Sequence, residues 1–120
     1  MKYTGDGVLA LLPSATSALE TARALHRELA DRTLGIRVGI HVGDVDVRGE
    51  DVSGLAVNIA ARIMSHAGVG ETLVSEAVRQ ATLGSRHDYH EVRTVSLKGV
   101  PGTWALHRCL GGPDDRAETP

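Results

Sequence analysis

The segment 55–67 places the strongest constraint on how this chain folds. Its apolar residues cover almost every face of a helix, and the polar exceptions recur at helical spacing at Asn58, Arg62 and Ser65. A helix that is apolar on most faces is largely buried in a globular protein. We therefore expect this helix to be buried, with its polar stripe facing a pocket or an interface rather than open water.

Arg62 is the residue of this stripe whose burial would cost the most free energy, because burying a guanidinium without a partner costs several kcal/mol. One interpretation is a buried ion pair with a nearby carboxylate. The candidates for that pair are Asp44, Asp46 and Asp51. The other interpretation is an anion clamp, in which the guanidinium stabilises negative charge that develops on a phosphoryl group. The residues alone favour neither interpretation over the other.

The composition narrows the class of protein. The 120 residues suit one small domain, and the absence of Phe implies a core of Val, Leu, Ile and Ala. A net charge of −2 gives no electrostatic reason to expect binding to nucleic acid or to a membrane. Cys109 is the single cysteine, which excludes an internal disulfide, and no apolar run approaches the roughly 20 residues of a membrane span. We expect a soluble, cytoplasmic protein without a leader peptide.

The hydropathy pattern predicts alternating strands and helices. The predicted strands cover 2–4, 8–12, 36–42, 72–75, 89–97 and 103–110. The predicted helices run from Ser14 to about residue 30, over 55–67, and from Ser75 to about residue 84, with Ser14, Ser17 and Ser75 as helix-start residues. The pattern also predicts a hairpin turn at 5–7, a polar loop at 48–53, a turn at 98–102 and a disordered tail at 111–120.

Two further residues are candidates for ligand binding, although their local sequence alone does not establish that role. Asp6 lies between two glycines at the predicted hairpin tip, where its carboxylate could bind Mg²⁺, although a turn aspartate is the favoured interpretation. Lys98 precedes Gly99 in a predicted turn, where a phosphate contact is possible and a solvated lysine is favoured. The six histidines lack zinc-ligand spacing, and we interpret them as structural or surface residues.

Taken together, these residues resemble the catalytic domain of class III nucleotide cyclases. The matching motifs are KYTGDG at 2–7, RVGIHVG at 37–43, DVSGLAVNIAAR at 51–62, GETLVS at 70–75 and LKG at 97–99. Their order and spacing follow the family over about residues 1–110, and they are most similar to the soluble mycobacterial-type adenylate cyclases. The resemblance implies a domain at 1–110 that converts ATP into cyclic AMP and pyrophosphate for cyclic-nucleotide signalling.

The resemblance also implies a role for individual residues. Asp6 matches the second of two aspartates that bind Mg²⁺ or Mn²⁺, two ions being usual in the family, and it is the one such ligand present here. Lys2 and Asp51 match the pair that reads adenine, as donor and acceptor respectively.

The phosphate and sugar contacts are implied in the same way. Asn58 matches the asparagine that orients the ribose, and Arg62 matches the arginine that stabilises the transition-state phosphate. Lys98 matches a lysine that contacts the triphosphate. The family places such sites at the interface of a head-to-tail homodimer, so the resemblance implies two shared sites and ATP as the partner molecule.

The implied fold is α+β, a ferredoxin-like βαββαβ core with extra C-terminal strands. The family's first strand and first helices have no counterpart before Lys2. Two explanations stay open, namely a start that is assigned too late and a truncated, catalytically inactive module that dimerises or binds nucleotide. A third alternative is a generic α/β domain with a buried Arg–Asp pair.

Overall fold

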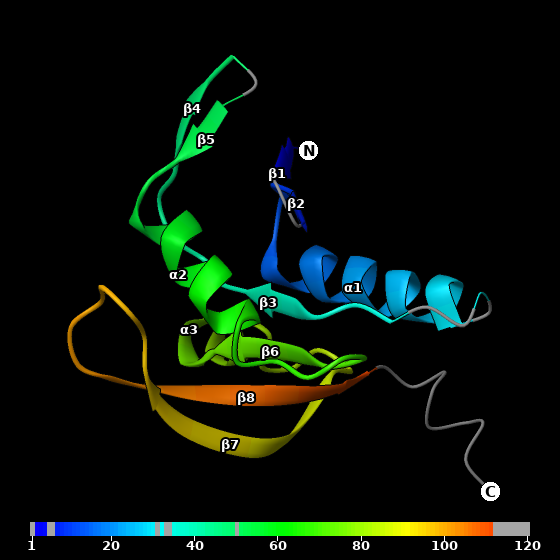
Figure 1. Ribbon diagram of the computed structural model, residues 1–120. Helices are drawn as coiled ribbons and strands as arrows, with labels where there is room; N and C mark the ends of the chain where they lie inside the picture. Colours follow the sequence, from blue (N-terminus) through cyan, green and yellow to red (C-terminus); the bar gives the residue numbers. More distant parts are fainter. Residues whose placement is uncertain (1, 5–6, 31, 33–34, 50, 112–120) are drawn as a thin grey trace, which may run out of the picture.

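The computed structural model describes residues 2–4, 7–30, 32, 35–49 and 51–111 of the chain. Residues 5 and 6 of the predicted hairpin turn, Asp6 among them, and residues 112–120 of the predicted tail lie outside these described residues. A four-stranded mixed sheet lies between helices on its two faces, and two small hairpins lie apart from it (Figure 1). The fold is therefore α+β, as the family resemblance implies.

The four-stranded sheet has the strand order β3-β6-β8-β7. β3 (Val38–Ile40) is parallel to β6 (Thr72–Ser75), whereas β8 (Thr103–Gly111) is antiparallel to both β6 and β7 (Asp88–Ser96). A parallel pair requires a crossover connection, and α2 (Leu55–Met64) lies within that connection. All four residues of β6 are buried, so this strand forms the centre of the fold.

Two helices cover one face of this sheet, α1 (Ala15–Ala30) and α3 (Glu76–Ala81). Their apolar side chains form a core cluster with β3 and β6, consisting of Ala15, Leu19, Ala22, Ile40, Val74 and Val78. The first turn of α1 confirms the predicted helix start, because the backbone N–H groups of Ser14 and Ser17 each donate to the other residue's hydroxyl at 3.1 Å.

α2 covers the opposite face of the sheet through a single apolar stripe. Ile59, Ile63 and the following Ala67 pack there, against Leu73, Leu97 and Leu106. The prediction that this helix is largely buried is wrong for the single chain, since Leu55 is 61% exposed and Met64 is 38% exposed. The reason is that no second layer of described residues packs on the outer side of α2.

Two hairpins extend from the same end of the molecule, one leading into α1 and the other into α2 (Figure 1). The first joins β1 (Lys2–Thr4) to β2 (Gly7–Leu9) and confirms the predicted N-terminal hairpin. The second joins β4 (Asp46–Arg48) to β5 (Asp51–Ser53), so the prediction of a polar loop over 48–53 is wrong. Gly49 permits this tight turn, because its φ of 62° is a conformation that other residues rarely adopt.

The remaining boundaries differ from the predictions by a few residues. The predicted strand over 36–42 is limited to β3, and α2 ends at Met64, three residues before the predicted end. The predicted helix after Ser75 ends at Ala81. Among the described residues, no helix combines the length and the apolar character needed to cross a membrane.

Candidate functional site

The polar stripe of α2 forms the centre of the candidate site. Asn58 and Arg62 are one helical turn apart, and both side chains are exposed. Ile59 and Ile63, each one position further along, are buried against the sheet and hold the opposite side of the helix in place. The structure therefore presents an amide and a guanidinium together on the outer face of one rigid helix.

Arg62 does not form the ion pair that one interpretation of the sequence predicts. Within the described part of the chain, no ion pair joins Arg62 to any of the three candidate aspartates, and Asp46 instead accepts from Arg48 at 3.2 Å. The expectation that the stripe avoids open water is also wrong for the single chain. A solvated guanidinium without a competing carboxylate suits the other interpretation, an anion clamp.

Two glycines determine how closely α2 lies against β3 and the segment after it. A Cβ at Gly39 would lie 2.4 Å from the Met64 amide nitrogen and 2.6 Å from the Ala60 carbonyl oxygen. A Cβ at Gly43 would lie 2.9 Å from the Ala56 Cβ. Because both glycines lack a side chain, the helix rests on the strand backbone, and this contact fixes the depth of its outer face.

The base-reading residues implied by the family resemblance come from the two hairpins. Asp51 is exposed at the start of β5, which contacts α2, and it pairs in register with Arg48. Lys2 begins β1 and pairs in register with Leu9, although its side chain is not among those described. Figure 1 shows both hairpins on the side of the molecule where α2 begins.

The remaining two residues stand apart from this arrangement. Lys98 is exposed in the turn between β7 and β8. Asp6, the expected metal ligand, lies outside the described residues. Among the residues that are described, no group of three or more His, Cys, Asp and Glu side chains is arranged to hold a metal ion. The described residues therefore do not by themselves form a site for Mg²⁺ or Mn²⁺.

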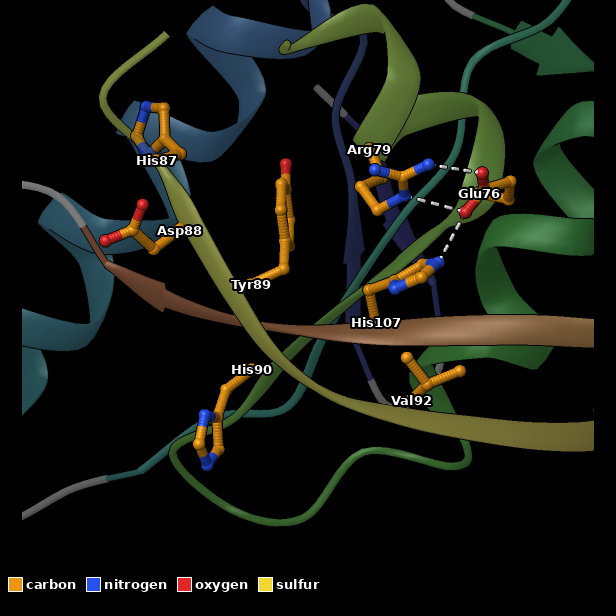
Figure 2. A pocket seen from close by; sticks show the side chains of 8 residues that line it. All are labelled: Glu76, Arg79, His87, Asp88, Tyr89, His90, Val92 and His107. Atoms are coloured by element: carbon orange, nitrogen blue, oxygen red, sulfur yellow. Dashed lines mark hydrogen bonds and ion pairs between the residues drawn. The ribbon is translucent and has the colours of Figure 1, made fainter. Parts of the chain in front are cut away.

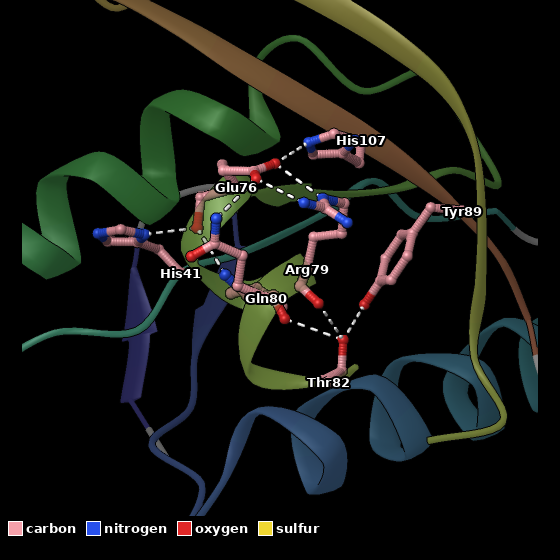
Figure 3. A network of polar contacts seen from close by, with 9 residues as sticks. His41, Glu76, Arg79, Gln80, Thr82, Tyr89 and His107 are labelled. Atoms are coloured by element: carbon pink, nitrogen blue, oxygen red, sulfur yellow. Dashed lines mark hydrogen bonds and ion pairs between the residues drawn. The ribbon is translucent and has the colours of Figure 1, made fainter. Parts of the chain in front are cut away.

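A polar network at the start of α3 was not predicted from the sequence (Figure 3). The hydroxyl of Ser75 accepts from the Val78 amide at 3.3 Å and is hydrogen-bonded to His41 Nδ1 at 2.7 Å. The next residue, Glu76, accepts from Arg79 at 2.6 and 2.8 Å. The three-residue spacing of Glu76 and Arg79 is the one signal that could have indicated this network.

Glu76 also joins α3 to the sheet. Its carboxylate lies 2.6 Å from Nε2 of His107 in β8. Hydrogen bonds from Arg79 and then from His107 lower the pKa of Glu76 to about 2, although desolvation opposes this shift. At the other end of α3, Thr82 is hydrogen-bonded to the hydroxyl of Tyr89 at 2.7 Å, and burial raises the pKa of Tyr89.

A hollow of about 490 Å³ opens beside this network (Figure 2). It is lined by Glu76, Arg79, His87, Asp88, Tyr89, His90, Val92 and His107. None of the site residues predicted from the sequence lines it, and it lies on the α3 face of the sheet rather than the α2 face. Because Glu76, Arg79 and His107 bind one another, we assign them a structural role in holding α3 on the sheet.

Comparison with known proteins identifies the family. Residues 8–108 match the family model described as the adenylate and guanylate cyclase catalytic domain. "Putative adenylate cyclase 3" of Rhizobium meliloti (strain 1021) is 36% identical over 134 aligned positions, which cover 99% of this chain and 22% of the relative. "Adenylate cyclase" of Streptomyces coelicolor is 38% identical over 88 positions, covering 72% of this chain and 23% of the relative.

A solved structure agrees with this match. The adenylate/guanylate cyclase/hydrolase from Silicibacter pomeroyi superimposes with a TM-score of 0.77 at 27% identity, and the alignment covers 90% of this chain and 69% of that one. The chain spans less than a quarter of the length of the two curated relatives described above. The family model covers most of the chain and includes α2 with Asn58 and Arg62. The chain therefore belongs to the family of adenylate and guanylate cyclase catalytic domains.

Proposed function

We propose that this domain converts ATP into cyclic AMP and pyrophosphate. The observation that carries the proposal is the exposed pair on α2, in which Arg62 has no ion-pair partner among the described residues. Family membership and the relatives named as adenylate cyclases support the choice of reaction.

In the proposed reaction the ribose 3′-hydroxyl attacks the α-phosphate in line, and pyrophosphate leaves. Negative charge grows on the phosphate oxygens as the transition state forms. Arg62 supplies a fixed positive charge that stabilises this developing negative charge, since guanidinium groups bind phosphate oxygens with directed hydrogen bonds. Asn58 lies one turn away on the same face and would orient the ribose.

The choice of ATP depends on Lys2 and Asp51. A lysine donor and a carboxylate acceptor complement the ring nitrogen and the amino group of adenine. A site that pairs these groups rejects a base that leaves them unpaired, because buried polar groups without partners cost free energy. Lys98 would contact the triphosphate. Asp6 is the one residue that we propose as a ligand of a divalent cation, since the described carboxylates form no cluster that could hold one.

A second copy of the chain is the proposed partner. Leu55 and Met64 leave apolar surface exposed on α2, the helix that carries Asn58 and Arg62. A head-to-tail homodimer would cover this surface and place the stripe of one copy against the nucleotide of the other. The expectation that the stripe faces an interface would then hold for the dimer, although the single chain leaves it exposed.

A catalytically inactive module that binds nucleotide or dimerises is the second candidate function. The exposed pair on α2, Asn58 and Arg62, also suits a site that only binds nucleotide. Such a module would keep Arg62 as a phosphate contact without turning the nucleotide over.

One assay separates the two candidates. The purified chain is incubated with ATP and Mn²⁺, cyclic AMP and pyrophosphate are quantified together, and ATP binding is measured by calorimetry. Equal amounts of both products support the cyclase. Binding of ATP without either product supports the inactive module, as does a dimer that neither binds ATP nor forms product. A monomer that neither binds ATP nor forms product rejects both candidates. Analytical ultracentrifugation of the same sample tests the proposed dimer.

A further inference from the structure

The loop between α2 and β6 is fastened to β7 by one ion pair, Glu71–Arg93. Arg93 donates through both terminal nitrogens to the Glu71 carboxylate, at 2.8 and 3.1 Å. The two side chains are 20% and 31% exposed, against 64% and 66% for the surface pair Glu28–Arg32. Glu71–Arg93 is thus a largely enclosed ion pair with two hydrogen bonds, in contrast to the solvated pair Glu28–Arg32 at the C-terminal end of α1.

Both partners of this pair also bind the backbone at the end of α2. The Gly68 amide donates to the Glu71 carboxylate at 2.7 Å, and Arg93 donates to the His66 carbonyl oxygen at 3.2 Å. His66 and Gly68 follow the C-terminal end of α2, where a cation is favoured by the helix dipole. Arg93, from β7, therefore holds the backbone that directly follows the C-terminal end of α2.

The electrostatics of the pair agree with this geometry. The hydrogen bond from Arg93 and then that from the Gly68 amide hold the pKa of Glu71 below its ordinary value. Glu91 also accepts from Arg93, and Arg108 lies 3.9 Å from the Glu71 carboxylate. The Glu71 carboxylate is consequently ionised at neutral pH and accepts hydrogen bonds from both Arg93 and the Gly68 amide.

We propose that Glu71 and Arg93 are positioning residues for Arg62. Arg62 lies in the last turn of α2, so its direction depends on where that end of the helix is held. Gly39 fixes the depth of the helix against β3, and the ion pair fixes its end against β7. Displacing a transition-state contact by about 1 Å can reduce turnover about a hundredfold. The inference rests on the proposed cyclase reaction for its effect on rate.

The test compares Arg93→Lys with the control Arg32→Lys in the full chain. Lysine keeps the charge but cannot bind Glu71 through two nitrogens and His66 at once. We expect Arg93→Lys to lower kcat about tenfold or more, with KM for ATP changed less than twofold. We also expect Arg93→Lys to speed hydrogen exchange at the amides of residues 65–68. In Arg32→Lys, kcat and this hydrogen exchange should both equal those of the parent.

The double exchange Glu71→Arg with Arg93→Glu separates positioning from simple attraction. It restores an ion pair, but arginine at position 71 cannot accept from the Gly68 amide. We expect thermal stability to exceed that of either single exchange but to stay below that of the parent, because the exchanged charges would face Arg108 and Glu91. We expect kcat and the hydrogen exchange of residues 65–68 not to recover. Full recovery of kcat, or unchanged exchange in Arg93→Lys, overturns the proposal. If the parent chain makes no cyclic AMP, the proposed function fails, and exchange alone decides whether the ion pair holds the end of α2.

Discussion

Gly39 of β3 lies in direct contact with the backbone of Met64 in α2, since a Cβ on the glycine would be only 2.4 Å from the Met64 amide nitrogen. Backbone atoms of a helix cannot rotate away as a side chain can. The helix that carries Asn58 and Arg62 therefore has one permitted depth above the sheet. Any side chain at position 39 must displace α2 or distort β3.

Gly39→Ala is accordingly expected to destabilise the fold by about 1–3 kcal/mol, the usual cost of overpacking a well-packed contact. Gly35→Ala is the matched control. Its Cβ would meet Cγ1 of Val69 at 2.3 Å, but Val69 is 66% exposed and its side chain is able to rotate away. Urea denaturation of both variants measures the difference, and equal losses would refute the backbone contact.

Arg62→Ala is expected to reduce cyclic AMP formation about a hundred- to a thousandfold, the usual cost of removing a group that stabilises transition-state charge. The free energy of unfolding should change by less than about 0.5 kcal/mol, because exposed side chains without partners contribute little. Arg86→Ala, at another exposed position, is the control. Turnover equal in the two variants would remove Arg62 from the mechanism.

Asp51→Asn tests the proposed base selection. The amide keeps the size of the carboxylate but adds a donor, which suits the carbonyl of guanine as well as the amino group of adenine. We expect the preference for ATP over GTP, measured as the ratio of kcat/KM values, to fall at least about tenfold. An unchanged ratio would place base reading elsewhere.

Acid should weaken the fold through Glu76. Its pKa is about 2 in the folded chain against an ordinary value of 4.5, so its stabilising contribution is complete above pH 4.5 and is lost as the pH falls toward 2. Glu76→Gln should therefore show a smaller fall in melting temperature over this window than the parent. Parallel curves for the two proteins would indicate that Glu76 is not held by Arg79 and His107.

Ser75→Ala should cost more than Ser14→Ala, although both remove a helix-start hydroxyl. Ser75 is fully buried and also binds His41, so its loss leaves a partly buried imidazole nitrogen without its partner. We expect a loss of about 2–3 kcal/mol for Ser75→Ala and about 1 kcal/mol for Ser14→Ala. Thermal and chemical denaturation check the order of the two values.

The helices and the long strands could be predicted because local patterns determine them. Ser14 and Ser75 precede apolar stripes of helical period, and the β7–β8 pair brackets a turn rich in glycine. The β4–β5 hairpin could not be predicted in this way. Most of its side chains are exposed, so no alternation between buried and exposed positions distinguishes it from a polar loop.

The prediction that α2 is largely buried was wrong for a related reason. Hydropathy reports that a surface is apolar, but it does not say whether the same chain covers that surface. Leu55 and Met64 are exposed because the described chain packs on one side of α2 only. The motif predicts Asn58 and Arg62 as site residues, whereas Glu71 and Arg93 lie far apart in sequence, and their contact depends on the sheet topology.

The rings of His41 and Trp104 form a T-shaped contact with a centroid distance of 5.7 Å and an interplanar angle of 78°. Trp104 is the only tryptophan in the chain and packs in the core cluster beneath α2. Burial lowers the pKa of His41, so the imidazole is neutral at pH 7 and becomes a cation only in more acidic solution. The chain thus contains its own optical probe. Indole emission reports, without any added label, on the protonation of His41 and on the packing beneath the helix that carries Asn58 and Arg62.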